Sequence, residues 1–390
     1  MKYLGINSKT LESSGAIYTA SEIAQQPALW FKIYMRILAE KDDLMNYINH
    51  VCQDIDKIVL TGAGTSAYIG ISLVGTLFRS TGVITNAIPS TDIVTHPLDY
   101  LRQDEKILLI SFARSGDSPE SLAVVQLADN HTKKCYHLII TCDDKGELYN
   151  YNSANKKYCF LLPSESNDKS LAMTSSYSGM LLAGLLISRL REIEQYRGQV
   201  ENLVSYGERI LNHYLEPLRE ISEKNFERAI FLGSGPLFGT ATESHLKLQE
   251  LTDGKVICKN DTYLGFRHGP KAVINGSTII IYLLSNNKQV SAYEMDLMKS
   301  IDELKSGTFR IAIIESPPEC GIVPADLVIN FSDNCDTSID EDFLAVSSIL
   351  PAQIIGFFKS RSLGLSPDSP SQRGAIHRIV QGVNIYGLNN

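Results

Sequence analysis

The sequence lacks the features that mark several large classes of protein. None of its seven cysteines forms a Cys-x-x-Cys pair or stands at metal-ligand spacing from a histidine, which favours free thiols over a metal centre. No run of Lys and Arg is long enough to follow a nucleic-acid backbone or an anionic membrane, and the net charge is −8. We therefore expect no metal, no nucleic-acid partner and no membrane partner.

Long apolar segments are also missing. The first fifteen residues contain no apolar core of the kind that a signal peptide requires. The apolar stretch Met180–Ile187 is too short to span a bilayer. A cytoplasmic location is the expectation. The 390 residues, 44% of them hydrophobic, are enough to bury the cores of two domains.

The chain contains one layout of strands and turns twice. The run Lys57–Leu60 ends in Thr-Gly-Ala-Gly, and the run Arg228–Leu232 ends in Gly-Ser-Gly, each followed by a small-residue helix pattern. Matching Leu60 with Leu232 sets the offset between the two layouts at 172 residues. The later strand-like runs of the first layout, 106–111, 137–141 and 158–162, correspond to 278–285, 310–314 and 327–331 in the second.

Short buried strands that alternate with helices predict parallel βαβ units, so the expected fold class is α/β. Helices are expected over Ser21–Glu40, with Ser21 as its N-cap, and over Leu171–Leu190 and Asp342–Ser360. The predicted domains are a helical segment 1–45, a first domain 46–197, a linker helix 198–224, a second domain 225–365 and a tail 366–390.

Two loops of the first domain have the composition of anion sites. Thr65 and Ser66 follow the first strand, and Arg114, Ser115 and Ser118 follow the second. Hydroxyls and backbone N–H groups at a helix N-terminus favour a phosphate, and an arginine adds a bidentate charge. Such hydroxyls also serve as simple N-caps, but two loops on adjacent strands favour one shared phosphate site.

The first loop also fits a dinucleotide fingerprint. Gly62-x-Gly64-x-x-Ala67 has the required spacing. That fold places an acidic residue about 20 residues further on to bind the ribose hydroxyls. Residues Arg79–Asn86 contain no acid, so we expect no nicotinamide cofactor, and no other cofactor is indicated.

The second domain carries a candidate acid–base set. Glu243, Lys247 and Glu250 are spaced to share one helix face, which is often a solvated ion-pair stripe. Their helix follows a glycine turn at a strand end, where ligands bind in parallel sheets. His268 stands before Gly-Pro on a predicted loop. A carboxylate and a histidine are the pair that an aldose–ketose proton transfer needs.

Together these motifs resemble the sugar isomerase (SIS) family. Gly-Thr-Ser, Ser-Gly-Asp-Ser, Glu-x-x-x-Lys-x-x-Glu and His-Gly-Pro carry the likeness, which begins at Glu22-Ile-Ala-Gln-Gln-Pro27 and reaches the C-terminus. The doubled arrangement is similar to the isomerase half of glucosamine-6-phosphate synthase. Phe112–Ser121, Leu264–Pro270 and Pro370–Gly382 resemble most closely the AgaS subfamily of galactosamine-6-phosphate deaminases and tagatose-6-phosphate isomerases. The resemblance implies two tandem SIS domains, each a flavodoxin-like parallel sheet flanked by helices.

The resemblance also implies roles for individual residues. Glu250 corresponds to the glutamate that transfers the proton between C1 and C2, with Lys247 and Glu243 in support. His268 corresponds to a ring-opening histidine that a neighbouring subunit supplies, which implies a homodimer. The phosphate would be bound by Thr65, Ser66, Ser115 and Ser118. The sugar would be bound by Gly64, Glu243, Thr174, Ser175 and His377.

Three departures from the synthase change the expected reaction. Arg114 lies where the synthase has another polar residue of its phosphate loop, and Arg378, beside His377, lies where the synthase tail has a lysine. Arg378 is expected among the catalytic residues, but an arginine does not form a Schiff base or readily give up its proton, so the resemblance does not fix its role. Residue 2 is Lys and no glutaminase domain is present. Without a captive ammonia source, the expected reaction is deamination or plain isomerisation.

The leading expectation is conversion of galactosamine 6-phosphate and water to tagatose 6-phosphate and ammonium. The alternatives are the corresponding glucosamine 6-phosphate reaction and simple ketose–aldose isomerisation of tagatose 6-phosphate. A further alternative is a regulator that binds a sugar phosphate without turning it over. Against the regulator stand Glu250 and His268 and the absence of a helix-turn-helix extension.

Overall fold

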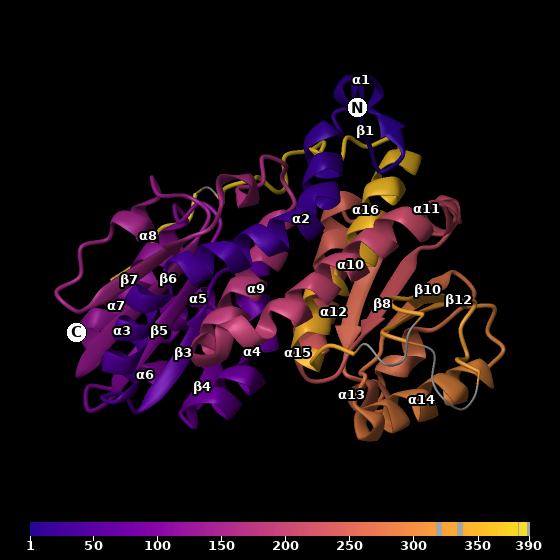
Figure 1. Cartoon of the computed structure of the whole chain (residues 1–390). Helices are drawn as coiled ribbons and strands as arrows, with labels where there is room; N and C mark the ends of the chain where they lie inside the picture. Colours follow the sequence, from indigo (N-terminus) through magenta and orange to yellow (C-terminus); the bar gives the residue numbers. More distant parts are fainter. Residues whose placement is uncertain (317–321, 334–337, 381, 388–390) are drawn as a thin grey trace. The chain divides into compact units, whose positions relative to one another are not determined.

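A computed structural model describes residues 1–316, 322–333, 338–380 and 382–387 (Figure 1). The chain divides into two compact units. Unit 1 comprises Met1–Ala28, Lys169–Thr174 and Gly198–Arg373, and unit 2 comprises Leu29–Asp168, Ser175–Arg197 and Gly374–Asn390. The boundary falls inside helix α2 (Ile17–Ala39).

Unit 2 is built on a parallel five-stranded sheet with helices on both faces. The strands lie in the order β4 (Ile84–Ala87), β3 (Lys57–Thr61), β5 (Lys106–Ala113), β6 (Lys134–Thr141) and β7 (Lys157–Leu161). The helices are α3 (Lys41–Cys52), α4 (Thr65–Thr81), α5 (Ser90–Thr95), α6 (Pro97–Tyr100), α7 (Pro119–His131), α8 (Glu147–Asn150) and α9 (Ser175–Ser188), with 3₁₀ turns at Ser164–Ser166 and Leu190–Tyr196.

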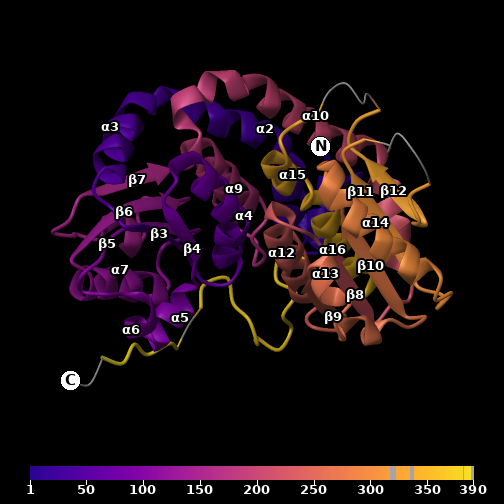
Figure 2. The same ribbon diagram turned by 90° about the horizontal axis from the view of Figure 1, so that it is seen from below.

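The two faces of this sheet are covered by different helices (Figure 2). Side chains of α5, α7 and α8 form one core with β3, β5 and β6. The opposite face of the sheet is lined by α3, α4 and α9. The strands β5 and β6 are buried along nearly their whole length, as parallel strands covered on both faces must be. Because β3 and β5 are parallel neighbours, their carboxyl ends lie side by side at one edge of the sheet.

Unit 1 contains a second parallel sheet of the same strand order. Its strands lie as β9 (Ile257–Asp261), β8 (Arg228–Leu232), β10 (Thr278–Leu283), β11 (Phe309–Ile314) and β12 (Leu327–Asn330). The remaining elements are a short hairpin of β1 (Lys2–Tyr3) and β2 (Ile6–Asn7), helices α1 (Ser8–Ser13), α10 (Arg197–His213), α11 (Leu215–Glu223), α12 (Pro236–Leu251), α13 (Tyr263–Phe266), α14 (Lys288–Asp302), α15 (Glu341–Ser347) and α16 (Leu350–Ser362), and a 3₁₀ turn at Pro270–Val273.

Packing divides these helices between the faces of the second sheet. The helices α13 and α14 bury apolar side chains against β8, β10 and β11. The helix α12 packs against β8, α15 and α16, and α16 packs in turn against α11. The α/β class and the two flanked parallel sheets expected from the sequence are confirmed.

The stretch Glu341–Ser362 is long and apolar enough to cross a membrane by length and composition, but its apolar window is entirely buried inside the structure. It consists of α15 and α16, separated at Ser348–Ile349. Burial of this kind is typical of a core helix, and a single such helix is weak evidence for a membrane span. The helix predicted at Asp342–Ser360 is thus broken in two.

Several predicted boundaries were wrong. The helix expected from Ser21 begins at Ile17 as α2, and the Ser21 hydroxyl donates to the Tyr18 carbonyl inside that helix at 3.0 Å. The linker helix 198–224 is two helices, α10 and α11. The helix expected from Leu171 begins at Ser175. These errors arise because side-chain partners, rather than local pattern, decide where a helix ends.

The sequence also did not predict the edge strands β4 and β9, and the assumed offset was one residue too long. The helix-start glycines Gly64 and Gly235 have nearly the same backbone angles, φ 54° and ψ −126° against φ 53° and ψ −127°. They are 171 residues apart, because 235 − 64 = 171, whereas matching Leu60 with Leu232 gave 172. Two apolar runs align almost equally well in either register.

A buried carboxyl connects two strand ends of unit 1. Glu294 of α14 is fully buried, and its Oε2 accepts a hydrogen bond from the Ser285 N–H at 2.8 Å. Its Oε1 has no hydrogen-bond partner among the described residues. Burial raises the pKa of Glu294 to about 7, although hydrogen bonds from Ser285 and Ser234 act in the opposite direction and Glu341 adds repulsion.

This pKa predicts how the stability of the protein changes with pH. A carboxyl with a pKa of about 7 in the folded state and 4.5 in the unfolded state binds more protons when folded between these values. The free energy of unfolding should therefore fall by about 3 kcal/mol as the pH rises from about 4.5 to 7. Glu294→Gln should remove this part of the pH dependence, measured by urea unfolding across that range. Glu303→Gln, an exposed change nearby, should leave the slope as in the parent; an unchanged slope in Glu294→Gln would contradict the assignment.

Candidate active site

The first predicted phosphate loop lies at the carboxyl end of β3. Gly64 adopts positive φ, a conformation that favours glycine, and it is the N-cap of α4 without a side-chain cap. Thr65 and Ser66 form the first turn of α4 and are both buried. They are therefore not N-caps themselves. Their position, at the N-terminus of a helix whose dipole is positive at that end, suits an anion.

The second predicted loop follows β5, the neighbour of β3. Arg114 is buried, and the Ser115 hydroxyl accepts a hydrogen bond from the Asp117 N–H at 3.3 Å. Ser118 precedes α7 but makes no side-chain capping bond, and its hydroxyl lies 2.6 Å from that of Ser121. The hydroxyls of both loops thus lie on adjacent strand ends.

Four buried polar atoms near this edge were not singled out from the sequence. The Oγ atoms of Ser90 and Ser111, the Oγ1 of Thr61 and the Oε2 of Glu120 are buried and have no hydrogen-bond partner among the described residues. Thr61 and Ser111 are paired across β3 and β5, near the carboxyl ends of both strands. Buried polar atoms are normally paired, so this edge retains unused hydrogen-bonding capacity. The only sequence signal was a hydroxyl near the end of each apolar run.

The C-terminal tail of unit 2 is attached to the same region. The guanidinium of Arg378 donates to the Asp168 carbonyl at 2.9 and 2.6 Å and to Oδ1 of Asn167 at 2.9 Å. The Arg378 carbonyl accepts a hydrogen bond from Arg114. His377 is exposed. Arg378 is thus committed to backbone and amide acceptors, and the tail contacts Arg114 of the second loop.

The predicted acid–base set lies on α12 of unit 1. The Nζ of Lys247 lies 3.3 Å from Oε1 of Glu243 and 2.5 Å from Oε2 of Glu250. The side chains of Glu243 and Lys247 are 0% and 1% exposed, and that of Glu250 is 22% exposed. The alternative of a solvated ion-pair stripe is therefore wrong, since two of the three groups are out of water.

The charges of this set support each other. Burial by itself lowers the pKa of Lys247, but the carboxylates of Glu243 and Glu250 outweigh this effect and raise it above the usual value. The ammonium therefore stays charged and holds Glu250 in one position at the edge of solvent. His245, between Glu243 and Lys247 on α12, was not singled out from the sequence. Burial lowers its pKa, which favours the neutral imidazole.

His268 lies on the loop between α13 and the following 3₁₀ turn. It is exposed, and its side chain makes no hydrogen bond or ion pair with other described residues. The loop itself is ordered by Thr262, whose hydroxyl accepts the Gly265 N–H at 3.0 Å. The imidazole is thus available to a ligand or to another protein chain.

Two of the predicted sugar-binding residues, Thr174 and Ser175, are buried at the start of α9. Thr174 is fully buried, and its carbonyl lies 3.5 Å from Nε2 of Gln353 in unit 1. Ser175 begins α9 in unit 2, where its N–H donates to Oδ1 of Asp168 at 3.1 Å. Their backbone groups are therefore already partnered within each unit.

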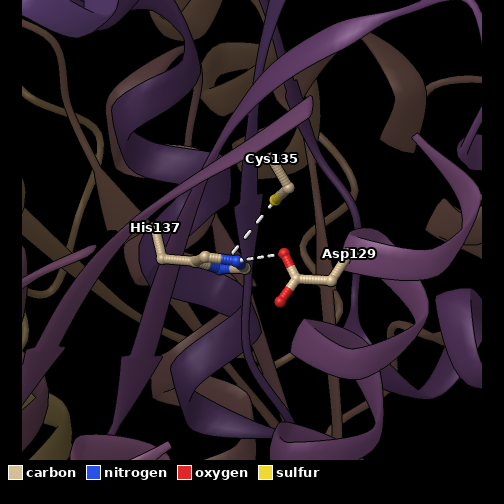
Figure 3. A group of neighbouring side chains, drawn as sticks. All are labelled: Asp129, Cys135 and His137. Carbon is tan, nitrogen blue, oxygen red and sulfur yellow. Dashed lines mark hydrogen bonds and ion pairs between the residues drawn. The ribbon is translucent and has the colours of Figure 1, made fainter. Parts of the chain in front are cut away.

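One group of residues has the composition of a metal site. Figure 3 shows the side chains of Asp129, Cys135 and His137 pointing toward one another in unit 2. Nε2 of His137 lies 2.8 Å from Asp129, and both Asp129 oxygens also accept hydrogen bonds from Tyr151, Ser153 and Asn155. The carboxylate is fully used, so this group is best explained as a hydrogen-bond network that fixes the chain after α8.

Comparisons with known proteins show which sequences this chain resembles. Residues 53–188 match the SIS domain family. The D-galactosamine-6-phosphate deaminase AgaS of Shewanella sp. (strain ANA-3) is 38% identical over 98% of this chain and 95% of its own length. The protein of that name from Escherichia coli is 35% identical over 95% of both chains.

Solved structures give the same result. A structure from Clostridium novyi NT has a TM-score of 0.96 and 39% identity, and the match covers 99% of both chains. The tagatose-6-phosphate ketose/aldose isomerase of Escherichia coli has a TM-score of 0.84 and 33% identity, again over 99% of both chains. The resemblance inferred from the sequence is confirmed.

The buried charges of α12 predict an asymmetric effect of mutation. Lys247→Met removes the ammonium and leaves the Glu243 carboxylate buried without its counter-ion, which should lower the free energy of unfolding by about 3–5 kcal/mol. Adding Glu243→Gln should restore part of that loss. Lys32→Met, which breaks an exposed pair with Glu165, should cost less than about 1 kcal/mol. Urea unfolding measures all three; equal costs for Lys247→Met and Lys32→Met would contradict this account.

Proposed function

The chain belongs to the AgaS family of SIS-domain proteins, and on this premise we propose that it converts galactosamine 6-phosphate and water to tagatose 6-phosphate and ammonium. The observation that carries the proposal is the buried Lys247 ammonium that holds the Glu250 carboxylate at the edge of solvent. A carboxylate fixed in this way is suited to move a proton between adjacent carbon atoms.

Each part of the reaction has a candidate group. The phosphate is bound by Thr65, Ser66, Arg114, Ser115 and Ser118, whose loops end adjacent strands. Helix N-termini and a guanidinium both favour this dianion. Gly64 allows the close approach of the first loop, since a Cβ is absent where the turn needs positive φ.

Ring opening and proton transfer are assigned to residues of unit 1. His268 assists opening of the sugar ring to the free aldehyde. Glu250 removes the proton from C2 and returns it to C1, which moves the carbonyl oxidation level to C2 and leaves an imine there. Water then adds to the imine carbon, and ammonium leaves. Lys247, itself paired with Glu243, keeps the Glu250 carboxylate in place.

Further parts of the proposal concern assembly and the tail. We expect a homodimer in the cytoplasm, in which His268 acts on the substrate of the partner subunit; its exposed imidazole without a described partner supports this role. Thr174, Ser175 and His377 are proposed to line the sugar site. Arg378 is proposed to act by holding the tail beside Arg114, since its guanidinium is engaged with Asn167 and Asp168.

The second candidate function is plain isomerisation of tagatose 6-phosphate. It is favoured by the Escherichia coli structure of that name at 33% identity. The same C1–C2 proton transfer serves both reactions, and they differ in whether a nitrogen leaves C2. No described residue decides between the galacto and gluco configurations at C4.

A substrate panel tests the proposed reaction. Purified protein is incubated with galactosamine 6-phosphate, glucosamine 6-phosphate and tagatose 6-phosphate, and ammonium release and ketose formation are measured. The expected result is ammonium release that is fastest with galactosamine 6-phosphate. Isomerisation of tagatose 6-phosphate without ammonium release from either hexosamine would favour the second candidate, and turnover of none would favour a sugar-phosphate sensor.

The role of Glu250 is tested by Glu250→Gln. The amide has nearly the same shape but cannot take up a proton, so kcat should fall by about a thousandfold or more. Binding of the substrate phosphate should change little, measured by competition with inorganic phosphate. A variant with near-parent kcat would remove Glu250 from the mechanism. Glu303→Gln is the matched exposed control.

A further inference from the structure

One motif of the sequence has no part in the proposed chemistry. Glu22-Ile-Ala-Gln-Gln-Pro27 lies on α2, far from both loops and from α12 in the sequence. Glu22 is 6% exposed and Gln26 is 0% exposed, and their spacing of four residues places them on one helix face. A buried carboxylate and a buried amide are costly unless they are hydrogen-bonded, so their partners indicate what they do.

The carboxylate of Glu22 binds the chain just before α9. Its Oε1 accepts hydrogen bonds from the backbone N–H groups of Lys169 at 2.6 Å and of Ser170 at 3.3 Å. Its Oε2 accepts the hydroxyl of Ser170. Three donors of two successive residues therefore converge on one carboxylate. Charge-assisted hydrogen bonds of this kind are about twice as strong as neutral ones.

The amide of Gln26 acts through a second helix. Its Nε2 donates to Oε1 of Gln353 on α16 at 2.6 Å, and Nε2 of Gln353 lies 3.5 Å from the Thr174 carbonyl. Gln353 is also fully buried. The amides of Gln26 and Gln353 thus connect α2 to Thr174, the last residue of the segment Lys169–Thr174. Glu22 binds the first two residues of the same segment.

The middle of the segment is held from the start of the tail. The Leu171 N–H donates to the Asp368 carbonyl at 3.0 Å. The Asp368 carboxylate accepts from the N–H and the hydroxyl of Thr19, both at 2.8 Å, which ties it to α2. All the anchors described, Glu22, Gln26, Gln353 and Asp368, belong to unit 1.

These contacts explain an unusual division of the chain. Lys169–Thr174 belongs to unit 1, although its neighbours Asp168 and Ser175 belong to unit 2. Six residues with little regular structure are held at their beginning, middle and end by buried polar groups. Thr174, proposed above to line the sugar site, is the last of them.

We propose that Glu22 and Gln26 are positioning residues, which hold Lys169–Thr174 so that Thr174 is correctly placed for the sugar. This inference rests on the proposed function and deepens it. It assigns a role in sugar recognition to a helix that contributes none of the phosphate-binding or proton-transferring groups. Affinity for the sugar portion, rather than for the phosphate, should depend on these two side chains.

Glu22→Gln tests the proposal in the full-length protein. The amide keeps the shape of the side chain but replaces one acceptor oxygen with a donor, which conflicts with the Ser170 hydroxyl or the two N–H groups. KM for the amino-sugar phosphate should rise about tenfold, as expected for one lost charge-assisted hydrogen bond. Inhibition by inorganic phosphate should stay within about twofold of the parent, because the phosphate loops are unchanged.

A second, milder variant separates the loss of this contact from a general folding defect. Ser170→Ala removes only the hydroxyl donor and should raise KM by a smaller factor than Glu22→Gln. Glu12→Gln, an exposed change of the same kind in unit 1, is the control and should leave every constant unchanged. A fall in kcat alone, or equal losses of sugar and phosphate affinity, would indicate a merely structural role and overturn the proposal.

Hydrogen exchange separates this inference from the proposed function. The amides of Lys169 and Ser170 should exchange about tenfold faster in Glu22→Gln than in the parent or in Glu12→Gln. This measurement needs no turnover, so it stands even if no hexosamine phosphate is a substrate. Unchanged exchange at both amides would overturn the positioning role, whereas a parent protein without turnover would overturn the proposed function alone.

Discussion

A glycine backbone conformation that other residues adopt only with strain turns the chain from strand to helix in each unit. Gly64 and Gly235 share this conformation to within a degree in both angles. The turn places a helix N-terminus directly at a strand end, with the partial positive charge of the helix at the edge of the sheet. The fold thus creates two equivalent positions, and the side chains around each decide what it does.

The two positions have diverged in their polar chemistry. In unit 2 the strand ends carry hydroxyls and an arginine, and buried oxygens of Thr61 and Ser111 have no partner among the described residues. In unit 1 a carboxyl group of the protein itself, that of Glu294, accepts the Ser285 N–H at the end of β10. This carboxyl group occupies a donor that resembles those proposed to bind phosphate in unit 2. The helix α12 of unit 1 carries the buried ion pairs instead.

Several charged side chains are buried in this fold, and removing a charge from water is unfavourable in free energy. Lys247, Glu243 and Glu22 are removed from water, and each is tolerable only because placed donors or counter-charges replace the lost hydration. Such networks tend to specify one arrangement of the groups rather than to add stability. A network that fixes one arrangement without adding stability is consistent with a catalyst, since proton transfer requires a carboxylate held in one position.

The sequence by itself determined the α/β class, most of the buried strands, the glycine turns and the family, because apolar period, turn residues and motif spacing are local properties. It did not reveal the edge strands β4 and β9, whose short, half-exposed segments lack a strong pattern. Whether Glu243 and Lys247 are solvated or buried was equally undecided, as was the role of Glu22. Only the tertiary structure decided these points, since burial and hydrogen-bond partners come from residues such as Ser170 and Gln353 that lie more than a hundred positions away from their partners on α2.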